Sequence, residues 1–126
     1  MNEHDSGAVF DQIGEAGFAS LVAAFYRRIP ADPILGPLYP EEDFAGAEQR
    51  LCDFLVFRFG GPSRYIEQRG HPALRMRHAP FAITQAARDR WVEFMEAALV
   101  EVQMPSEAAT DLRHFFNEAA TFLVNR

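Results

Sequence analysis

Apolar side chains recur every three or four residues in four separate segments of this chain, and that spacing places them along one face of a helix. The first predicted helix runs from Ala16 to Ile29 and ends before Pro30, because proline disfavours helical geometry in the residue before it. The second runs from Phe44 to Phe59 and ends at a Gly-Gly-Pro turn. The apolar faces consist of Phe18, Leu21, Val22, Phe25 and Ile29 in the first helix, and of Ala47, Leu51, Phe54 and Leu55 in the second.

Two later segments show the same spacing. Thr84 is predicted to cap the start of a third helix that ends before Pro105, and Ser106 is predicted to cap a fourth. Because no segment alternates apolar and polar residues as a half-buried strand does, the sequence predicts an all-α fold. The inward positions are Trp91, Phe94, Met95, Ala98, Leu99 and Val102 in the third helix, and Leu112, Phe115, Phe116, Ala119 and Leu123 in the fourth.

The segments outside these helices are expected to be irregular. Prolines and one glycine interrupt Ala31 to Pro40, which contains Tyr39. Ser63 to Pro80 has room only for short helical pieces, because Gly70 and two prolines break it. Residues 1–8 are predicted to form a flexible polar tail.

Length and charge limit the class of protein. A chain of 126 residues with 48% apolar side chains fits one domain spanning 1–126 with a single core. The formal charge of −6 argues against nucleic acid or an anionic membrane as a main partner, since both would repel an acidic surface. Cys52 is the single cysteine, so an internal disulfide is excluded and a reducing compartment is expected.

The first ten residues, MNEHDSGAVF, lack the basic start and the apolar run of a secretory signal. No stretch is expected to cross a membrane, because none contains the ~18 consecutive apolar residues that a span needs. We therefore expect the protein in the cytoplasm.

Four histidines are candidates for metal binding. His4 lies in the predicted tail, and His114 lies in the fourth helix between a charged and an apolar residue. His71 precedes a proline and is expected to set a turn, while His78 closes a short helical piece before Pro80. A zinc site built on His71 and His78 lacks an Asp, Glu or Cys at useful spacing. Without further information, a hydrogen-bonded or solvated side chain remains the ordinary interpretation of His78.

A family resemblance changes that interpretation. The segment from Tyr65 to Ile83 reads YIEQRGHPALRMRHAPFAI and closely resembles the signature of the group II truncated haemoglobins. Four further blocks match in the order and at the spacing of that family, so that the resemblance covers about Phe10 to Asn125. These blocks are AFYRR around Tyr26, LYPEEDFAGAEQRL from Leu38 to Leu51, GGP at Gly60 to Pro62, and RDRWVEFM around Trp91.

The resemblance implies a haem protein. In that family the residue matching His78 is the proximal ligand of haem iron, and the helices form a two-over-two sandwich that encloses the haem. The sequence has no Cys-x-x-Cys-His motif, so we expect haem b held without thioether bonds. Arg77 and Arg50 are expected to face the haem propionates; otherwise they are solvated surface arginines.

The resemblance also implies a ligand pocket. Tyr26, Tyr39 and Trp91 match positions that point toward the ligand of the iron, although each could be a core aromatic bonded to backbone. Ala47 stands where many globins carry a distal histidine, so the aromatic residues must supply any hydrogen bonds. The apolar residues expected to line the haem are Leu51, Phe54, Leu74 and Met95.

Three functions are consistent with these features. The first is a haem protein that binds dioxygen tightly and uses it, in nitric oxide dioxygenation or in peroxide turnover. The second is a non-enzymatic carrier or sensor of oxygen or redox state. The third is a haem-free helical interaction module. The expected partners are dioxygen, other small diatomic ligands and a reductase, while the oligomeric state remains open.

Overall fold

The computed structural model describes residues 7–126, which form helices joined by turns and contain no strand. The all-α prediction is confirmed. The elements, in order, are α1 (Gly7–Tyr26), the short 3-10 helices η1 (Gly36–Leu38) and η2 (Glu41–Asp43), α2 (Phe44–Arg58), α3 (Arg64–Arg69), α4 (Leu74–His78), α5 (Gln85–Glu101) and α6 (Ser106–Leu123).

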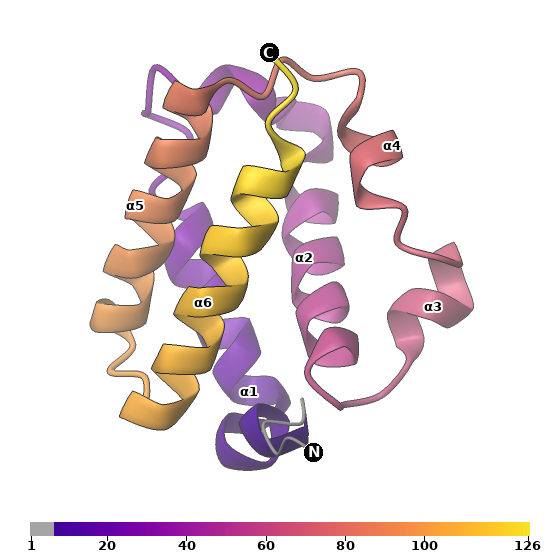
Figure 1. The fold of residues 1–126 in the computed structure, drawn as a ribbon, viewed down its shortest axis with the longest axis vertical. Coiled ribbons are helices and arrows are strands. Elements are labelled where there is room, and N and C mark those ends of the chain that lie inside the picture. The colour runs from indigo at the N-terminus through magenta and orange to yellow at the C-terminus, as the bar shows by residue number, and fades with distance from the viewer. Residues whose placement is uncertain (1–6) are drawn as a thin grey trace.

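The long helices pack as two pairs. α1 contacts α2, α5 contacts α6, and α1 also contacts both members of the second pair. Figure 1 shows α5 and α6 side by side, while the short helices α3 and α4 lie beyond α2 at the edge of the molecule. This arrangement confirms the predicted two-over-two sandwich.

The first helix differs from its predicted bounds. It begins at Gly7 instead of Ala16 and bends at Gly14, where a φ of 67° interrupts the helical geometry. The earlier start follows from apolar contacts, because Val9 is buried and the Phe10 ring stacks on Phe18. Residues 7 and 8, assigned to the tail from sequence, are thus helical, while residues 1–6 and His4 with them lie outside the described part of the chain.

By length and composition, Ala8–Tyr26 could cross a membrane, which the sequence analysis does not anticipate. Its large apolar side chains are instead buried in the protein, and a core helix passes the same test. These side chains are Phe18, Leu21, Val22 and Phe25.

The starts of α5 and α6 can be compared with the caps predicted for them. Thr84 caps α5 as predicted, because its hydroxyl accepts a hydrogen bond of 3.0 Å from the amide of Ala87. The predicted Ser106 cap is wrong. Pro105 occupies the cap position, and Ser106 is already the first helical residue, whose carbonyl accepts from the Thr110 hydroxyl.

Gly61 is required where α2 ends. A Cβ atom there would lie 2.5 Å from the Phe10 ring and 2.7 Å from Val56, closer than real Cβ contacts. The chain can therefore turn tightly against α1 only with glycine at this position.

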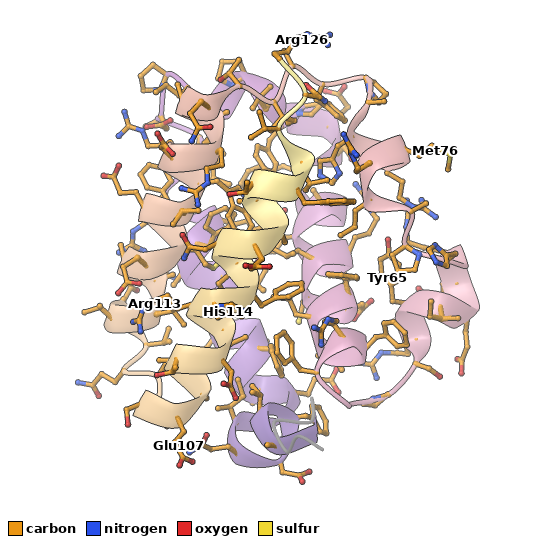
Figure 2. All side chains as sticks on the ribbon, in the orientation of Figure 1. Tyr65, Met76, Glu107, Arg113, His114 and Arg126 are labelled. Atoms are coloured by element: carbon orange, nitrogen blue, oxygen red, sulfur yellow. The ribbon has the colours of Figure 1, made fainter. Side chains whose placement is uncertain are left out.

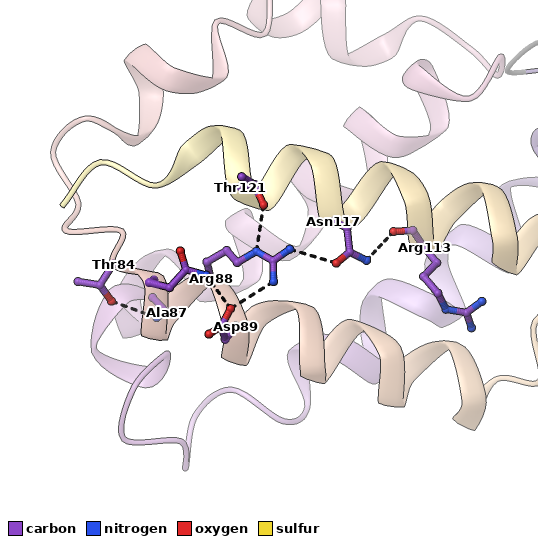
Figure 3. A network of polar contacts seen from close by, with 8 residues as sticks. Thr84, Ala87, Arg88, Asp89, Arg113, Asn117 and Thr121 are labelled. Atoms are coloured by element: carbon purple, nitrogen blue, oxygen red, sulfur yellow. Dashed lines mark hydrogen bonds and ion pairs between the residues drawn. The ribbon is translucent and has the colours of Figure 1, made fainter.

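A polar network joins the start of α5 to the end of α6 (Figure 3). The Arg88 guanidinium donates to the Thr121 hydroxyl and to the Asn117 side-chain oxygen, both at 3.1 Å. It also pairs with Asp89 at 3.2 Å. Because the Arg88 side chain also reaches the wall of the central cavity, this network fixes one side of that cavity.

Candidate functional site

A cavity of about 330 Å³ lies between the helix pairs, and α4 forms part of its wall. Most of its walls are apolar side chains, and they come from all six α-helices and from the connections between them. Ten of the eleven site residues expected from sequence line this one cavity: Tyr26, Tyr39, Ala47, Arg50, Leu51, Phe54, Leu74, Arg77, His78 and Trp91.

Met95 is the exception. It does not line the cavity and is buried in the hydrophobic core. Met95 lies one turn after Trp91 on the same helix. Periodicity identifies the inward face correctly, but it does not tell which turn of that face reaches the cavity.

His78 is the last residue of α4 and lies on the cavity wall. Its Nδ1 atom is 2.8 Å from the carbonyl oxygen of Leu74, one helical turn earlier. A carbonyl only accepts, so Nδ1 carries the ring proton and donates. In the neutral ring, Nε2 is then the unprotonated nitrogen, and an unprotonated imidazole nitrogen is the form that binds a metal.

The other described histidines have different surroundings. His71 sets the turn before α4, as predicted, because its Nδ1 accepts a hydrogen bond of 3.1 Å from the amide of Ala73. His114 is exposed on α6 (Figure 2). Within residues 7–126, no group of three or more His, Cys, Asp or Glu side chains is placed to hold a metal ion.

Asn125 holds the segment that follows His78, and the sequence analysis does not identify it. Its side-chain oxygen accepts from the amide of Ile83 at 2.9 Å, and its backbone amide donates to the Ile83 carbonyl at 2.9 Å. Its side-chain amide donates to the carbonyls of Phe81 at 3.0 Å and of His78 at 3.4 Å. The end of the chain thus fixes the short connection between α4 and α5.

Tyr26, Tyr39 and Trp91 lie together on the cavity wall. The Tyr26 and Tyr39 rings are perpendicular, with centroids 5.5 Å apart, and Phe44 packs edge-on against both. Phe25 packs against Tyr26 at 5.3 Å and against Trp91 at 5.2 Å. These edge-to-face contacts hold the three polar-tipped rings in fixed orientations.

Hydrogen bonds connect the polar tips. The Tyr39 oxygen takes part in side-chain hydrogen bonds with Trp91 and Tyr26, both of which lower its pKa, although burial raises the pKa of Tyr39 overall to about 12. An indole N–H only donates, so Tyr39 accepts from Trp91. The hydrogen bond between Tyr39 and Tyr26 uses one of the two phenolic protons, which leaves the other to donate elsewhere.

Tyr26 is also buried, and this burial raises the pKa of its phenol far above the usual range. Both phenols therefore keep their protons at any physiological pH. The cluster offers the cavity neutral hydrogen-bond donors and no negative charge.

The arginines on the cavity wall are held in different ways. Arg77 donates through Nε to the Pro72 carbonyl at 2.7 Å and through Nη2 to the Arg69 carbonyl at 2.8 Å. Arg50 pairs with Asp43 at 2.5 Å, which lowers the pKa of that carboxyl group. Arg69 and Arg88 also line the cavity, although the sequence analysis does not identify them.

The described side chains fit a haem. Nε2 of His78 would suit ligation of the haem iron, and the apolar walls would suit a porphyrin ring. Arg50, Arg69 and Arg77 bring guanidinium groups to the same wall, and guanidinium pairs well with carboxylates such as propionates.

A two-over-two helical sandwich that places one imidazole and a cluster of polar-tipped aromatic rings on the wall of one apolar cavity has the features of a globin. Comparison with known proteins agrees with this class. Residues 8–125 match the model of the bacterial-like globin family. The chain belongs to that family.

The most informative relatives are bacterial haemoglobins. The chain is 45% identical to the haemoglobin of Chloroflexus aurantiacus, whose crystal structure it matches with a TM-score of 0.90 over 94% of this chain and 98% of that one. It is 35% identical over 119 residues to a group 2 truncated haemoglobin of Bacillus subtilis, covering 94% of this chain and 89% of that protein. A solved structure described as a truncated oxygen-avid haemoglobin of Bacillus subtilis matches with a TM-score of 0.88 and 35% identity, over 93% of this chain and 98% of that one.

The resemblance to group II truncated haemoglobins is thus confirmed. Membership of the globin family implies a haem cofactor and the binding of dioxygen and other diatomic ligands.

The contacts of Asn125 lead to a testable prediction. Asn125→Ala removes the side-chain hydrogen bonds to Ile83 and Phe81, each worth about 1 kcal/mol. We expect the α4–α5 connection to loosen and ferric haem to dissociate about 10-fold faster, measured by transfer to an excess of a haem-scavenging apoprotein. Thr110→Ala is the control, since it removes one exposed side-chain hydrogen bond, to the Ser106 carbonyl at the start of α6, and Thr110 does not line the cavity. Equal haem loss from both variants would refute the role of Asn125.

Proposed function

We propose that this chain binds haem b through His78 and holds dioxygen tightly in order to use it in oxidation chemistry. The observation that carries the proposal is the shared cavity, in which the unprotonated imidazole nitrogen and the Tyr26–Tyr39–Trp91 cluster lie on the walls of one apolar space. When bound, haem supplies an iron atom at which diatomic ligands attach.

On the proximal side, the hydrogen bond from His78 to Leu74 has two effects. It fixes which ring nitrogen is free, and it restricts rotation of the imidazole. Such a bond also makes the ligating nitrogen more basic. The chain has no Cys-x-x-Cys-His motif, which supports a haem held by ligation, apolar burial and ion pairs.

For the propionates, Arg69 and Arg77 are the favoured partners, with Arg50 as a third. Arg77 is already oriented by the carbonyls of Pro72 and Arg69. Arg50 would have to share its guanidinium with Asp43, which holds it in the described arrangement. Arg77 therefore fits the role expected from sequence better than Arg50 does.

On the distal side, the aromatic cluster provides donors for a ligand that acquires negative charge. The Trp91 indole donates to the Tyr39 hydroxyl, which also shares a hydrogen bond with Tyr26, so one of the two phenols has a proton to offer to the cavity. Donors that are already oriented stabilise charge well in a space with little water. Ala47 contributes no donor, which leaves this task to the aromatic cluster.

Tight binding of dioxygen suits its use in an oxidation reaction better than its delivery to another molecule. A relative of this chain is described as oxygen-avid. The reaction that we favour converts nitric oxide and dioxygen to nitrate. It consumes one electron in each turnover, so a reductant has to restore the ferrous iron.

Rapid mixing of the oxygenated protein with nitric oxide tests this reaction. We expect one nitrate for each nitric oxide consumed, faster than the protein autoxidises, with repeated turnover when a reductase is added. Consumption of nitric oxide without nitrate, or no turnover above autoxidation, would contradict the enzymatic proposal and favour a carrier or sensor.

A further inference from the structure

A second hollow lies beside α4. It is an open groove of about 440 Å³ between α4, the end of α2 and the end of α6. We call it the α4 groove. Its walls are mostly apolar, and the charged side chains at its edges are Arg58 and Arg75. The apolar lining includes Phe54, Phe57, Leu74, Met76, Phe115 and Phe122.

The α4 groove is separated from the central cavity by a single layer of side chains. Phe54, Leu74 and Phe115 line both spaces. Leu74 is also the residue whose carbonyl orients His78. A molecule seated in the groove would therefore lie directly behind the wall of the proposed haem site.

The groove carries exposed apolar side chains. Met76 is 71% exposed and Phe122 is 54% exposed, and Met76 points away from the body of the protein (Figure 2). Among residues 7–126, the other strongly exposed large apolar side chain is Val100, at the end of α5. Adjacent exposed apolar residues with arginine beside them are typical of a surface that binds another protein.

The chain segment that supplies α4 and the turn before it is basic, whereas the whole chain is acidic. Residues 58–78 contain five arginines and one acidic residue, which gives +4, while the whole chain carries −6 and the remainder therefore −10. Arg75 lies 5.0 Å from the centre of the Phe122 ring, and Arg58 lies 4.9 Å from that of Phe115. No carboxylate of the described residues forms an ion pair with Arg75 or Arg77. Two haem propionates would still leave this segment at +2.

We propose that the α4 groove docks an acidic one-electron carrier protein, which delivers the electron that returns ferric haem iron to the ferrous state. The proposal rests on the proposed function, because only a redox cycle needs this step. The carrier is an iron–sulfur or flavin protein; it loses one electron, the iron gains one, and no bond forms or breaks.

Charge favours a compact acidic protein over a membrane or a nucleic acid. An extended anionic surface would meet both the basic segment and the −10 of the remaining chain, and the larger charge would repel it. A protein contact buries only about 800 Å² on each partner, a small part of the surface that an extended membrane or nucleic acid would present. Exposed Met76 would then enter the interface, with Arg75 at its edge.

Binding of a plant-type [2Fe–2S] ferredoxin, a small acidic one-electron carrier, to the ferric haem protein tests this proposal. We expect saturable binding by calorimetry that weakens as salt rises. Met76→Glu and Arg75→Glu should each raise the Kd about 10-fold or more and slow the reduction of the iron by ferredoxin in parallel. Val100→Glu is the matched control, since it places the same charge on an equally exposed apolar site outside the groove.

The absorption spectrum and the dioxygen affinity of each variant distinguish a failure of the docking proposal from a failure of the proposed function. If they match the wild type while ferredoxin binding is lost, the groove is the docking site. If the wild type binds haem normally but neither ferredoxin nor an acidic flavodoxin binds it, the docking proposal fails and the proposed function stands. If Val100→Glu weakens ferredoxin binding as much as the groove variants do, the docking proposal is also overturned. Binding to phosphatidylglycerol vesicles that depends on Met76 would overturn it as well. Absence of haem from the wild type would refute the proposed function itself.

Discussion

His78→Ala is expected to lose its haem. His78 is the imidazole on the cavity wall whose Nε2 is free to bind iron, and removal of an outer-shell partner of a metal ligand alone costs up to about 100-fold in affinity. Loss of the ligand itself should cost at least as much. Titration of the apoprotein with ferric haem, followed by absorption, measures the change.

A second variant separates ligation from folding. His78→Gly leaves space for free imidazole, and we expect millimolar imidazole to restore a spectrum close to that of the wild type. His114→Ala is the control, because His114 is exposed on α6 and away from the cavity. An unaltered spectrum in His78→Ala would rule out His78 as the ligand of the iron.

Trp91→Phe is expected to release dioxygen faster. Its indole N–H donates to the Tyr39 oxygen at the cavity wall, and phenylalanine keeps the ring but removes the donor. Without Trp91, the phenol that donates to the negatively charged ligand is no longer held in place. A hydrogen bond to a charged group contributes about 1.5–3 kcal/mol, so its loss should raise the dissociation rate constant of dioxygen by roughly 10-fold or more. Stopped-flow displacement by carbon monoxide measures this rate.

Two comparisons show whether the effect is electrostatic. Carbon monoxide acquires little charge, so its dissociation should change far less than that of dioxygen. Phe94→Leu changes an aromatic residue on the same helix that does not line the cavity, and its rates should match the wild type. Unchanged dioxygen release in both Trp91→Phe and Tyr26→Phe would remove the distal network from the account.

The helices could be predicted from sequence wherever a local signal marks their ends. Thr84 supplies a side-chain acceptor for α5, and the Gly-Gly-Pro turn ends α2 within one residue of the expected position. The start of α1 could not be predicted, because it depends on the contact of Phe10 with Phe18 across a bend at Gly14. The predicted cap at Ser106 failed, because α6 starts directly after Pro105.

The site could be predicted only in part from the residues themselves. An isolated histidine at the end of a five-residue helix carries no pattern that identifies a metal ligand, and it was the resemblance to a family that singled out His78. Asn125 and Arg69 could not be found from the spacing of residues. Asn125 bonds to the backbone of Ile83, which is far away in the sequence, and Arg69 lines the cavity from a different helix than His78. Periodicity places Met95 on the inward face of α5, but it does not tell whether that residue lies in the core or on the cavity wall.

The central claim is that one cavity binds one haem through an imidazole nitrogen. Its most direct test is resonance Raman spectroscopy of the ferrous, ligand-free haem protein, which detects the stretching vibration between iron and a neutral imidazole. We expect this band in the wild type and its absence from His78→Gly, with a shifted band when imidazole is supplied. A wild-type protein that takes up no haem, or the same band in His78→Gly without imidazole, would contradict the account.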